Sequence, residues 1–384
     1  MLWVSKKEYD GPIHAVISGY FGYGNSGDDT VLDCLVSEIR REYPGAVIAV
    51  LCHDPEAFGR AHGVIGIGRY DILSIIRVLR KTRLLISGGG SLLQNVTSSR
   101  SLRYYAGIIT LAKMCGARVF IYANGIGPLI GRTGKRIACK AVMRADRISV
   151  RDSASKETLA DIGVPEKRVS VTADPAFRLA LAERVDTSDI KRSIGMTKGR
   201  RYFAVSLRYS VCEGDSGSEV CRALRDIYLK LGLIPVFVSM QESEDGELCR
   251  MMAENTCGEA LVIPPQPSEV LCSLMGDMAF VVSMRLHMMI YAAAVGTPSV
   301  VISVDPKLDA AAKILGTAEI VCEGDLSSES FLEAAVRALS HDRDALIKVS
   351  RSGAAKSLED AAYAADMMRD NCTAEDASEN EAVL

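Results

Sequence analysis

A cation and an imidazole lie two residues apart in this chain, at Arg285 and His287. They follow an apolar run at 278–282 that is typical of a buried strand, and a helical pattern comes after them. In an open α/β sheet, ligands bind at the carboxyl ends of the strands, where this junction would lie. A guanidinium can hold an anion there, and an imidazole can move a proton near neutral pH. The pair predicts a site for an anionic substrate, with an ion-paired arginine and a surface histidine as the structural alternative.

Two further cations follow predicted strands and favour the same interpretation. Lys307 comes after the next strand pattern, and Arg151 comes after a strand pattern in the first half of the chain. The neighbouring Asp152 would cap the following helix, which requires no further function. A small substrate with two negative charges would suit these residues together. The set is Arg151, Arg285, His287 and Lys307.

The first glycine-rich loop contains Gly22, Gly24 and Gly27 at the spacing of the dinucleotide-binding fingerprint. Asp28 and Asp29 then occupy the start of the predicted helix, where a pyrophosphate would have to sit. Carboxylates at this position stabilise the helix dipole and would repel a phosphate. Nicotinamide binding is therefore the weakest of the functional hypotheses.

Two more glycine-rich loops follow predicted strands in the same half of the chain. One contains Gly88, Gly89 and Gly90, and the other begins at Asn124. Unhindered backbone N–H groups in such loops suit an oxyanion or the close approach of a sugar. Each loop alone would be explained by turn chemistry. Three loops at the carboxyl ends of strands in one sheet predict a ligand surface facing a cleft.

Strand and helix patterns alternate along almost the whole chain. The strand patterns lie at 14–18, 46–52, 84–87, 118–122, 147–150 and 169–172, and then at 202–207, 234–239, 260–263, 279–282, 299–303 and 319–321. Nearly continuous Val, Ile and Leu strands between helices are typical of parallel sheets covered on both faces. The predicted fold class is α/β, with two doubly wound Rossmann-like domains facing a cleft.

The domain boundaries follow from changes in this pattern. Residues 1–177 are predicted to form the N-terminal domain and residues 201–355 the C-terminal domain. The segment 178–200 is strongly charged without a clear period, so we place the connection there. Residues 356–384 are predicted to be a C-terminal helix and an acidic tail.

Composition and charge argue against several classes of protein. A net charge of −3 argues against nucleic-acid binding, because proteins that bind nucleic acid are typically basic. Eleven cysteines without a Cys-x-x-Cys pair fit a reducing cytoplasm and argue against a structural zinc site. The longest charge-free run, 288–304, is broken by glycine and proline and is shorter than the roughly 20 residues of a spanning helix. We expect a cytoplasmic protein without a membrane span, a metal or a nucleic-acid partner.

Six motifs in order carry a family resemblance. They are Gly-Tyr-Phe-Gly-Tyr-Gly-Asn-Ser-Gly-Asp at 19–28, Ser-Gly-Gly-Gly-Ser-Leu-Leu-Gln at 87–94, Tyr-Ala-Asn-Gly-Ile-Gly-Pro at 122–128, Arg-Asp-Ser at 151–153, Met-Arg-Leu-His at 284–287 and Asp-Pro-Lys at 305–307. Through them the sequence resembles the polysaccharide pyruvyltransferase family over residues 14–316. It is most similar to the branch that modifies secondary cell wall polymers of Gram-positive bacteria for S-layer anchoring. Asn124 stands where that branch has Gln, which leaves the acceptor sugar open.

The resemblance implies a GT-B-type fold and a specific reaction. Such an enzyme transfers pyruvate from phosphoenolpyruvate to two hydroxyls of a sugar as a ketal, without a cofactor. The implied acceptor is a lipid-linked saccharide with N-acetylmannosamine at the inner face of the cytoplasmic membrane. It would bind on the side of the N-terminal domain, with phosphoenolpyruvate on the side of the C-terminal domain.

The resemblance also implies roles for individual residues. Arg151, His287 and Lys307 would contact phosphoenolpyruvate. On chemical grounds, His287 is the best candidate for the proton donor, because an imidazole can titrate near neutral pH. Arg285 would either hold the anion or brace its loop, and the two roles are equally open. The candidates for the base are Asp28, Asp29 and Asp174, and helix capping is the stronger explanation of the first two. The residues assigned to the acceptor or its loops are Gly24, Asn25, Gly27, Asp28, Gly88, Gly89, Gly90, Gln94, Asn124 and Asp174.

Two other functions are alternatives, and two kinds of interaction, with a second copy of the chain and with a membrane, are open. A sugar-nucleotide glycosyltransferase of the same architecture would use the Gly- and Ser-rich segment 208–218. A catalytically inactive scaffold that binds sugar is the other rival. A homo-oligomer is open, and so is a peripheral membrane contact through the amphipathic, basic segment 71–83. The ordinary alternative is that this segment packs its apolar face on the sheet, and we favour it.

Overall fold

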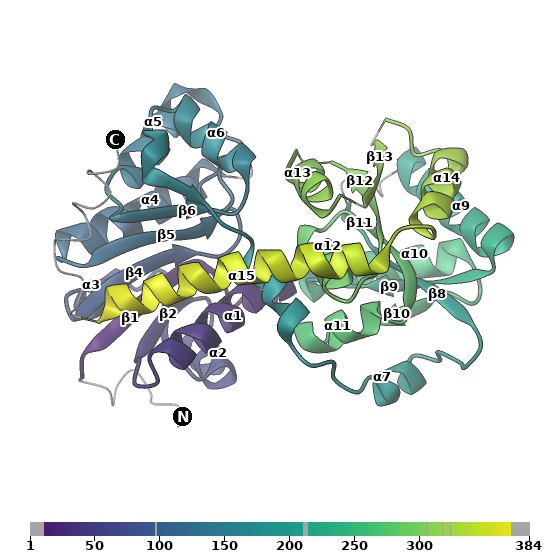
Figure 1. The fold of residues 1–384 in the computed structure, drawn as a ribbon, viewed down its shortest axis with the longest axis horizontal. Coiled ribbons are helices and arrows are strands. Elements are labelled where there is room, and N and C mark those ends of the chain that lie inside the picture. The colour runs from purple at the N-terminus through teal and green to yellow at the C-terminus, as the bar shows by residue number, and fades with distance from the viewer. Residues whose placement is uncertain are drawn as a thin grey trace. The chain divides into compact units, whose positions relative to one another are not determined.

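The computed structural model describes residues 11–96, 98–209, 214–304, 306–316, 318–322 and 324–369, apart from the side chains of 214–216, 306 and 307. The chain forms two compact units (Figure 1). Unit 1 consists of the described parts of 1–23, 28–175 and 356–384, and unit 2 consists of the described parts of 24–27 and 176–355. The segment predicted as the connection, 178–200, therefore belongs to unit 2, and the chain beyond 355 returns to unit 1.

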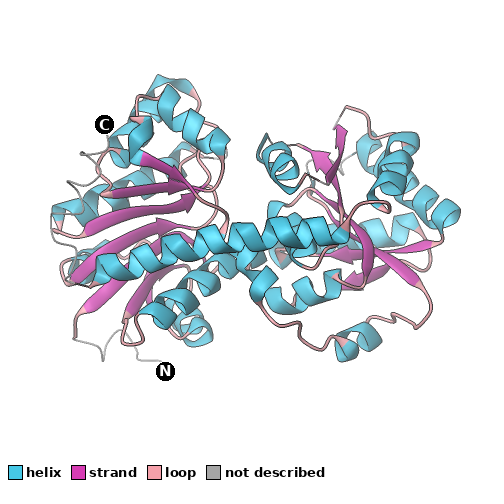
Figure 2. Ribbon diagram, viewed as in Figure 1, coloured by secondary structure: helices cyan, strands magenta, loops and turns pink. Residues whose placement is uncertain are grey.

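Unit 1 contains a parallel sheet of seven described strands in the order β3-β2-β1-β4-β5-β6-β7. The strands are β1 (Ile13–Phe21), β2 (Ile48–Cys52), β3 (Ile65–Gly68), β4 (Thr82–Gly88), β5 (Arg118–Asn124), β6 (Arg147–Val150) and β7 (Val169–Val171). The order reverses between β1 and β4, as in a Rossmann sheet, because the chain winds outward first to one side and then to the other. Figure 2 shows these strands flanked by helices.

Helices cover both faces of this sheet. They are α1 (Ser26–Glu42), α2 (Pro55–His62), α3 (Ile72–Leu79), α4 (Ser99–Met114), α5 (Gly131–Val142) and α6 (Ser153–Asp161), with the 3-10 turns η1 (Glu166–Arg168) and η2 (Pro175–Leu181). Apolar residues of α3, α4, α5 and α6 form one core with the sheet, and those of α1 and α2 form another. The strands are thus buried on both faces, which explains their continuous apolar character.

The C-terminal helix α15 (Arg343–Met368) completes the second of these cores. Its residues Ala361, Ala364, Ala365 and Met368 are fully buried. They recur at helical spacing and form one apolar stripe. The stripe packs with strand residues of unit 1 such as Phe120, and Figure 1 shows the helix lying along this sheet. The segment after 356 is therefore part of the unit 1 core, which its sequence position did not reveal.

Unit 2 repeats the scheme with six described strands in the order β10-β9-β8-β11-β12-β13, again all parallel. The strands are β8 (Arg201–Ser206), β9 (Leu233–Val238), β10 (Leu261–Ile263), β11 (Met278–Ser283), β12 (Ser299–Ser303) and β13 (Ala318–Cys322). The order reverses between β8 and β11. That switch point is where a ligand site is expected in unit 2.

The helices of unit 2 are α7 (Ser188–Ser193), α9 (Gly214–Leu231), α10 (Glu242–Thr256), α11 (Ser268–Met275), α12 (Leu286–Ala294), α13 (Pro306–Leu315) and α14 (Ser328–Ala338). One core of this unit joins α9, α10 and α14 to the sheet through residues such as Leu224, Leu248 and Phe331. The long charge-free run of the sequence divides into α12 and β12. Among the residues described, no helix is both long and apolar enough to cross a bilayer.

Candidate functional site

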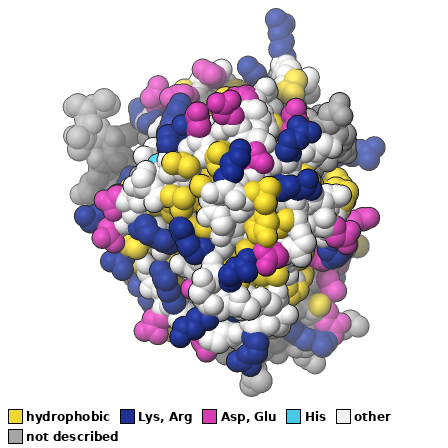
Figure 3. All heavy atoms as spheres, turned by 90° about the vertical axis from the view of Figure 1, so that its right-hand side faces the viewer, with side chains coloured by type: hydrophobic (Ala, Val, Ile, Leu, Met, Phe, Trp, Pro, Cys, Tyr) yellow, Lys and Arg dark blue, Asp and Glu magenta, His cyan; other side chains and the backbone are white. Residues whose placement is uncertain are grey.

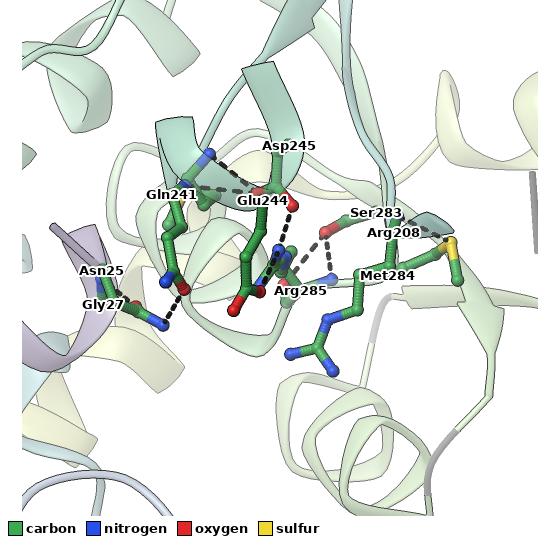
Figure 4. Close-up of polar contacts among 10 residues, drawn as sticks. Asn25, Gly27, Arg208, Gln241, Glu244, Asp245, Ser283, Met284 and Arg285 are labelled. Atoms are coloured by element: carbon green, nitrogen blue, oxygen red, sulfur yellow. Dashed lines mark hydrogen bonds and ion pairs between the residues drawn. The ribbon is translucent and has the colours of Figure 1, made fainter. Parts of the chain in front are cut away.

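The first glycine-rich loop joins unit 2, although it follows the first strand of unit 1. The Ser26 N–H donates to the Met240 carbonyl at 2.9 Å, and the Asn25 amide donates to Oε1 of Gln241 at 3.3 Å (Figure 4). The Asn25 Oδ1 accepts from the Gly27 N–H at 3.1 Å, so it caps α1. The sequence assigned Gly24, Asn25 and Gly27 to the N-terminal domain, but these contacts tie the loop to the end of β9. The difference arises because packing, not chain order, decides where a short loop lies.

His287 lies in the first turn of α12, half-buried against this loop. A Cβ atom added to Gly27 would lie only 2.0 Å from Nδ1 of His287, so no other residue fits there unless the imidazole moves. One turn further along α12, the Tyr291 hydroxyl donates to the Ser26 carbonyl at 3.1 Å. The loop is thus held on α12, and its backbone sets the position of the imidazole. Sequence reasoning missed Tyr291, although its spacing of four from His287 puts both residues on one helix face.

This close approach predicts a large effect of Gly27→Ala. The added methyl group would push the imidazole of His287 from its position while leaving its chemistry unchanged. If His287 takes part in turnover, kcat should fall about 100-fold, as expected for a catalytic group displaced by about 1 Å. The measurement is phosphate release under saturating substrate, with the folded state checked by circular dichroism. Gly258→Ala is the matched control, because a Cβ at Gly258 meets nothing within 4 Å; full activity of Gly27→Ala would contradict the argument.

Arg285 is buried and engaged within its own unit. Its guanidinium pairs with the carboxylate of Asp245, and its backbone N–H donates to the Ser283 hydroxyl at 2.9 Å (Figure 4). Asp245 in turn accepts from the N–H groups of Met240 and Gln241 at 3.3 and 3.2 Å. These are the residues that hold the first glycine-rich loop. Of the two roles open for Arg285, the geometry favours bracing.

Arg208 is a further cation at the switch point of unit 2. It follows the carboxyl end of β8, and its backbone N–H donates to Sδ of Met284 at 3.4 Å. Its side chain is exposed and extends away from its own strand (Figure 4). Sequence reasoning named Arg208 only as the start of the glycosyltransferase segment 208–218, in which 210–213 lie outside the described residues. The sequence feature that could have identified Arg208 is its position directly after the first predicted strand of the second half of the chain.

Lys307 lies in the first turn of α13, directly after β12. Its side chain lies outside the described part of the structure, as does the whole of Asp305. The backbone position of Lys307 at the carboxyl end of a unit 2 strand matches the sequence prediction.

Arg151 lies in unit 1 and is held by a carboxylate of the same unit. It is only 8% exposed, and its Nη1 pairs with Oδ2 of Asp174 at 2.9 Å. Its Nη2 donates to the Ser91 hydroxyl at 3.1 Å, and its Nε lies 3.8 Å from Oδ2 of Asp152. Much of the charge of Arg151 is therefore balanced inside the unit. The four residues predicted to bind phosphoenolpyruvate are thus divided, with Arg151 in unit 1 and the others in unit 2.

The second and third glycine-rich loops meet at the carboxyl ends of β4 and β5. The Asn124 amide donates to the Ser87 carbonyl at 2.6 Å, and the Gly125 N–H donates to the Gly90 carbonyl at 3.1 Å. A Cβ on Gly90 would lie 2.5 Å from Oδ1 of Asp28, so that carboxylate closely approaches the Gly90 backbone. The second and third loops are thus in contact at one edge of the sheet, with Gly88, Gly89 and the half-buried Gln94 in the same segment. Gly24, Asn25 and Gly27 of the first loop belong to unit 2 instead.

Asn124 has a structural role at this junction. It is fully buried, and its Oδ1 has no hydrogen-bond partner within the described ranges. The preceding Ala123 has a φ of 45°, in the left-handed region, and the pairing register of β5 with β6 shifts between Ile121 and Asn124. Such an irregularity re-aims the side chain that follows. The Asn124 amide therefore ties the end of β5 to the end of β4 through the Ser87 carbonyl.

Asp29, one of the base candidates, has a shifted pKa. Burial raises the pKa of Asp29 to about 6, and Asp33 adds to the rise, whereas His62 and a hydrogen bond with the Gly22 backbone oppose it. His62 also bonds to Oδ1 of Asp33 through Nδ1. A carboxyl that titrates near 6 is suited to accept a proton near neutral pH.

The raised pKa of Asp29 predicts how stability depends on pH. Folding favours the protonated carboxyl, so this contribution is fully present below about pH 4 and is lost as the pH rises through about 6. Asp29→Asn keeps a neutral side chain, so it should stabilise the protein at pH 7.5 by about 1–3 kcal/mol and have little effect at pH 4. Denaturant unfolding of both proteins at the two pH values measures this. An equal effect at both pH values would contradict the assignment.

Solved structures with the same fold give an independent comparison. One is the UDP-GlcNAc 2-epimerase from Neisseria meningitidis bound to UDP-GlcNAc, at 12% identity and a TM-score of 0.61 over 91% of this chain and 97% of that chain. Another is HepE from Anabaena in complex with UDP and glucose, at 11% identity and a TM-score of 0.60 over 97% and 100% of the two chains. At such identities the likeness concerns the fold alone. It confirms the prediction of two Rossmann-like domains of the GT-B class.

Sequence comparison gives the family. No curated protein matches the chain. The profile of the polysaccharide pyruvyl transferase family, however, matches residues 25–306. The match begins in the first glycine-rich loop, includes the Arg285–His287 segment and ends at the start of α13. Because it covers most of the chain, this protein belongs to the polysaccharide pyruvyl transferase family.

Proposed function

We propose that the protein transfers pyruvate from phosphoenolpyruvate to two hydroxyls of a sugar as a ketal and releases phosphate. The observation that carries this proposal is the position of His287, whose imidazole is set by Gly27 at the first turn of α12. This contact brings an acid–base group, His287, against the first glycine-rich loop, where the match to the family begins. We further propose a cytoplasmic enzyme whose acceptor is a lipid-linked wall polysaccharide precursor with N-acetylmannosamine, of the kind used in S-layer anchoring.

The donor is a small molecule with a carboxylate and a phosphate, and it needs cations. In unit 2, the exposed Arg208 and the residues after β11 and β12 offer such contacts at the carboxyl edge of the sheet. Lys307 would serve as a point charge for the phosphate. Arg285 would act through Asp245 and the loop, because its guanidinium is already paired. Arg151, which Asp174 orients, is a further proposed contact of the donor.

The chemistry can be written so that atoms and charges balance. His287, as the imidazolium, would give a proton to the vinyl CH2 carbon of phosphoenolpyruvate, which becomes a methyl group and leaves oxocarbenium character at C2. One sugar hydroxyl would add to C2 and lose its proton to a base. The second hydroxyl would then form the other C–O bond at C2 and give its proton to the neutral imidazole of His287, while the C2–O bond to phosphate breaks and phosphate leaves with the electron pair.

The proposed base and the proposed acceptor site both lie in unit 1. Asp29, with its pKa of about 6, is the base best matched to a neutral cytoplasm. Asp28 and Asp174 stay candidates, although Asp28 contacts Gly90 and Asp174 holds Arg151. The loops that contain Gly88, Gly89 and Gly90 offer backbone N–H groups to a sugar.

The decisive experiment is phosphate release from phosphoenolpyruvate with and without a synthetic disaccharide containing N-acetylmannosamine. Acceptor-dependent release, with one phosphate per ketal seen by mass spectrometry, is the expected result. Stabilisation by phosphoenolpyruvate without turnover on several acceptors would mean that the acceptor assignment is wrong. If the protein shows no turnover and is not stabilised by phosphoenolpyruvate, the proposal is overturned.

A sugar-nucleotide glycosyltransferase is the second candidate, because solved structures of this fold hold UDP or UDP-sugars. S. aureus MnaA with UDP is a further example, at 13% identity and a TM-score of 0.62 over 90% of this chain and 94% of that chain. The fold alone carries this alternative. Thermal stabilisation by a UDP-sugar, together with none by phosphoenolpyruvate, would favour it.

A further inference from the structure

An apolar groove lies on unit 1, where α4 packs against α5 and meets the start of α3. Its volume is about 630 Å³, and its apolar lining includes Ile72, Tyr104, Ile108, Leu111, Met114 and Ile137. Gly107 of α4 also lines it, and a Cβ added there would meet nothing within 4 Å. We refer to these residues, with Leu73 next to Ile72, as the α4–α5 groove.

Large apolar side chains at this groove are exposed to an unusual degree. Leu73 is 77% exposed, Met114 78% and Ile72 49%. Single exposed apolar residues are common, but several around one groove mark a site of interaction. The amphipathic stripe of α3 does not account for them, because its Ile75 and Val78 are buried in the core of unit 1. The exposed apolar residues Ile72 and Leu73 lie in the first turn of α3 instead.

The rim of the groove carries positive charge. Arg103, Lys140 and Arg144 line it and are exposed. Within the described ranges, no carboxylate pairs with any of the three. The sequences of α4 and α5 contain seven Lys or Arg residues and no Asp or Glu, in a chain whose net charge is −3. On the face drawn in Figure 3, by contrast, acidic and basic side chains are interspersed.

We infer that the α4–α5 groove docks unit 1 on the surface of an anionic phospholipid bilayer. Apolar side chains surrounded by cations are the arrangement by which proteins lie in a membrane interface, with the apolar part among the acyl chains and the cations at the headgroups. Charge complementarity argues for this occupant, because the cations of the rim would be attracted to anionic headgroups but would gain no such attraction from a neutral partner. The inference goes beyond the proposed pyruvyl transfer and can be tested without turnover.

The test is co-sedimentation of the full chain with vesicles of phosphatidylcholine mixed with phosphatidylglycerol, compared with phosphatidylcholine alone. The triple variant Arg103→Glu, Lys140→Glu, Arg144→Glu should lower the partition coefficient on anionic vesicles about tenfold or more. The matched control is Lys198→Glu, Arg222→Glu, Lys348→Glu, which reverses three exposed cations of unit 2 and changes the net charge equally. It should bind like the original protein. Thermal unfolding of both triples checks that they fold.

A second pair of variants tests the apolar part. Leu73→Ser with Met114→Ser should weaken binding even at high salt, where the contribution of the cations is screened. Leu229→Ser with Val336→Ser, at positions 67% and 51% exposed in unit 2, is the control. Failure of the original protein to bind anionic vesicles would overturn the inference. Equal loss of binding in the groove triple and its control triple would also overturn it, because binding would then depend on net charge alone.

Discussion

Replacing His287 with alanine is expected to abolish most of the turnover while leaving the fold intact. A positioned general acid contributes about 10²–10⁴-fold to a rate, so acceptor-dependent phosphate release should fall by that range. The side chain is half-buried and lies in the first turn of α12, so its loss leaves only a small gap at the surface of the unit. The measurement is kcat for phosphate release, together with the melting temperature.

The matched control is His53→Ala, which removes an exposed imidazole from unit 1. It should keep full activity. Phosphoenolpyruvate should still raise the melting temperature of the His287→Ala protein, because the cations that would hold the donor are unchanged. Full turnover in that variant would remove His287 from the mechanism, and loss of the folded state would mean that the residue is structural.

Asp245→Ala is expected to have the largest effect on stability. Asp245 is 2% exposed and Arg285 is 7% exposed, so the substitution would leave a buried guanidinium without its main partner. Breaking a buried ion pair from one side costs about 3–5 kcal/mol, because the remaining charge is neither solvated nor compensated. It would also remove the acceptor of the Met240 and Gln241 N–H groups. Denaturant unfolding followed by circular dichroism measures the loss.

Two comparisons separate the bracing role from a general effect of losing an ion pair. Asp226→Ala breaks the exposed pair with Lys230 in the same unit and should cost less than about 1 kcal/mol. Replacing both Arg285 and Asp245 with apolar residues should recover part of the stability lost in Asp245→Ala, because no unpaired charge remains. A cost for Asp245→Ala as small as that for Asp226→Ala would contradict the bracing role of Arg285.

Local patterns in the sequence determined the class of fold and the places of several candidate residues at the ends of strands. Continuous apolar strands alternating with helices can only be buried as parallel sheets, so two Rossmann-like domains followed from periodicity alone. The same reasoning placed Arg285 and His287 at the carboxyl end of a strand, which is now β11, next to the switch point of unit 2. These features are predictable because they depend on neighbours a few residues apart.

The tertiary structure alone decided how the candidate residues are partnered. Three of these contacts join distant parts of the chain. Gly27 sets the position of His287, Arg285 pairs with Asp245, and Arg151 pairs with Asp174. The return of α15 to the core of unit 1 also joins distant parts of the chain. Periodicity shows which face of an element is buried, but not which partner buries it. That choice depends on side-chain shape and charge across a packed interior, which one sequence does not encode in any local pattern.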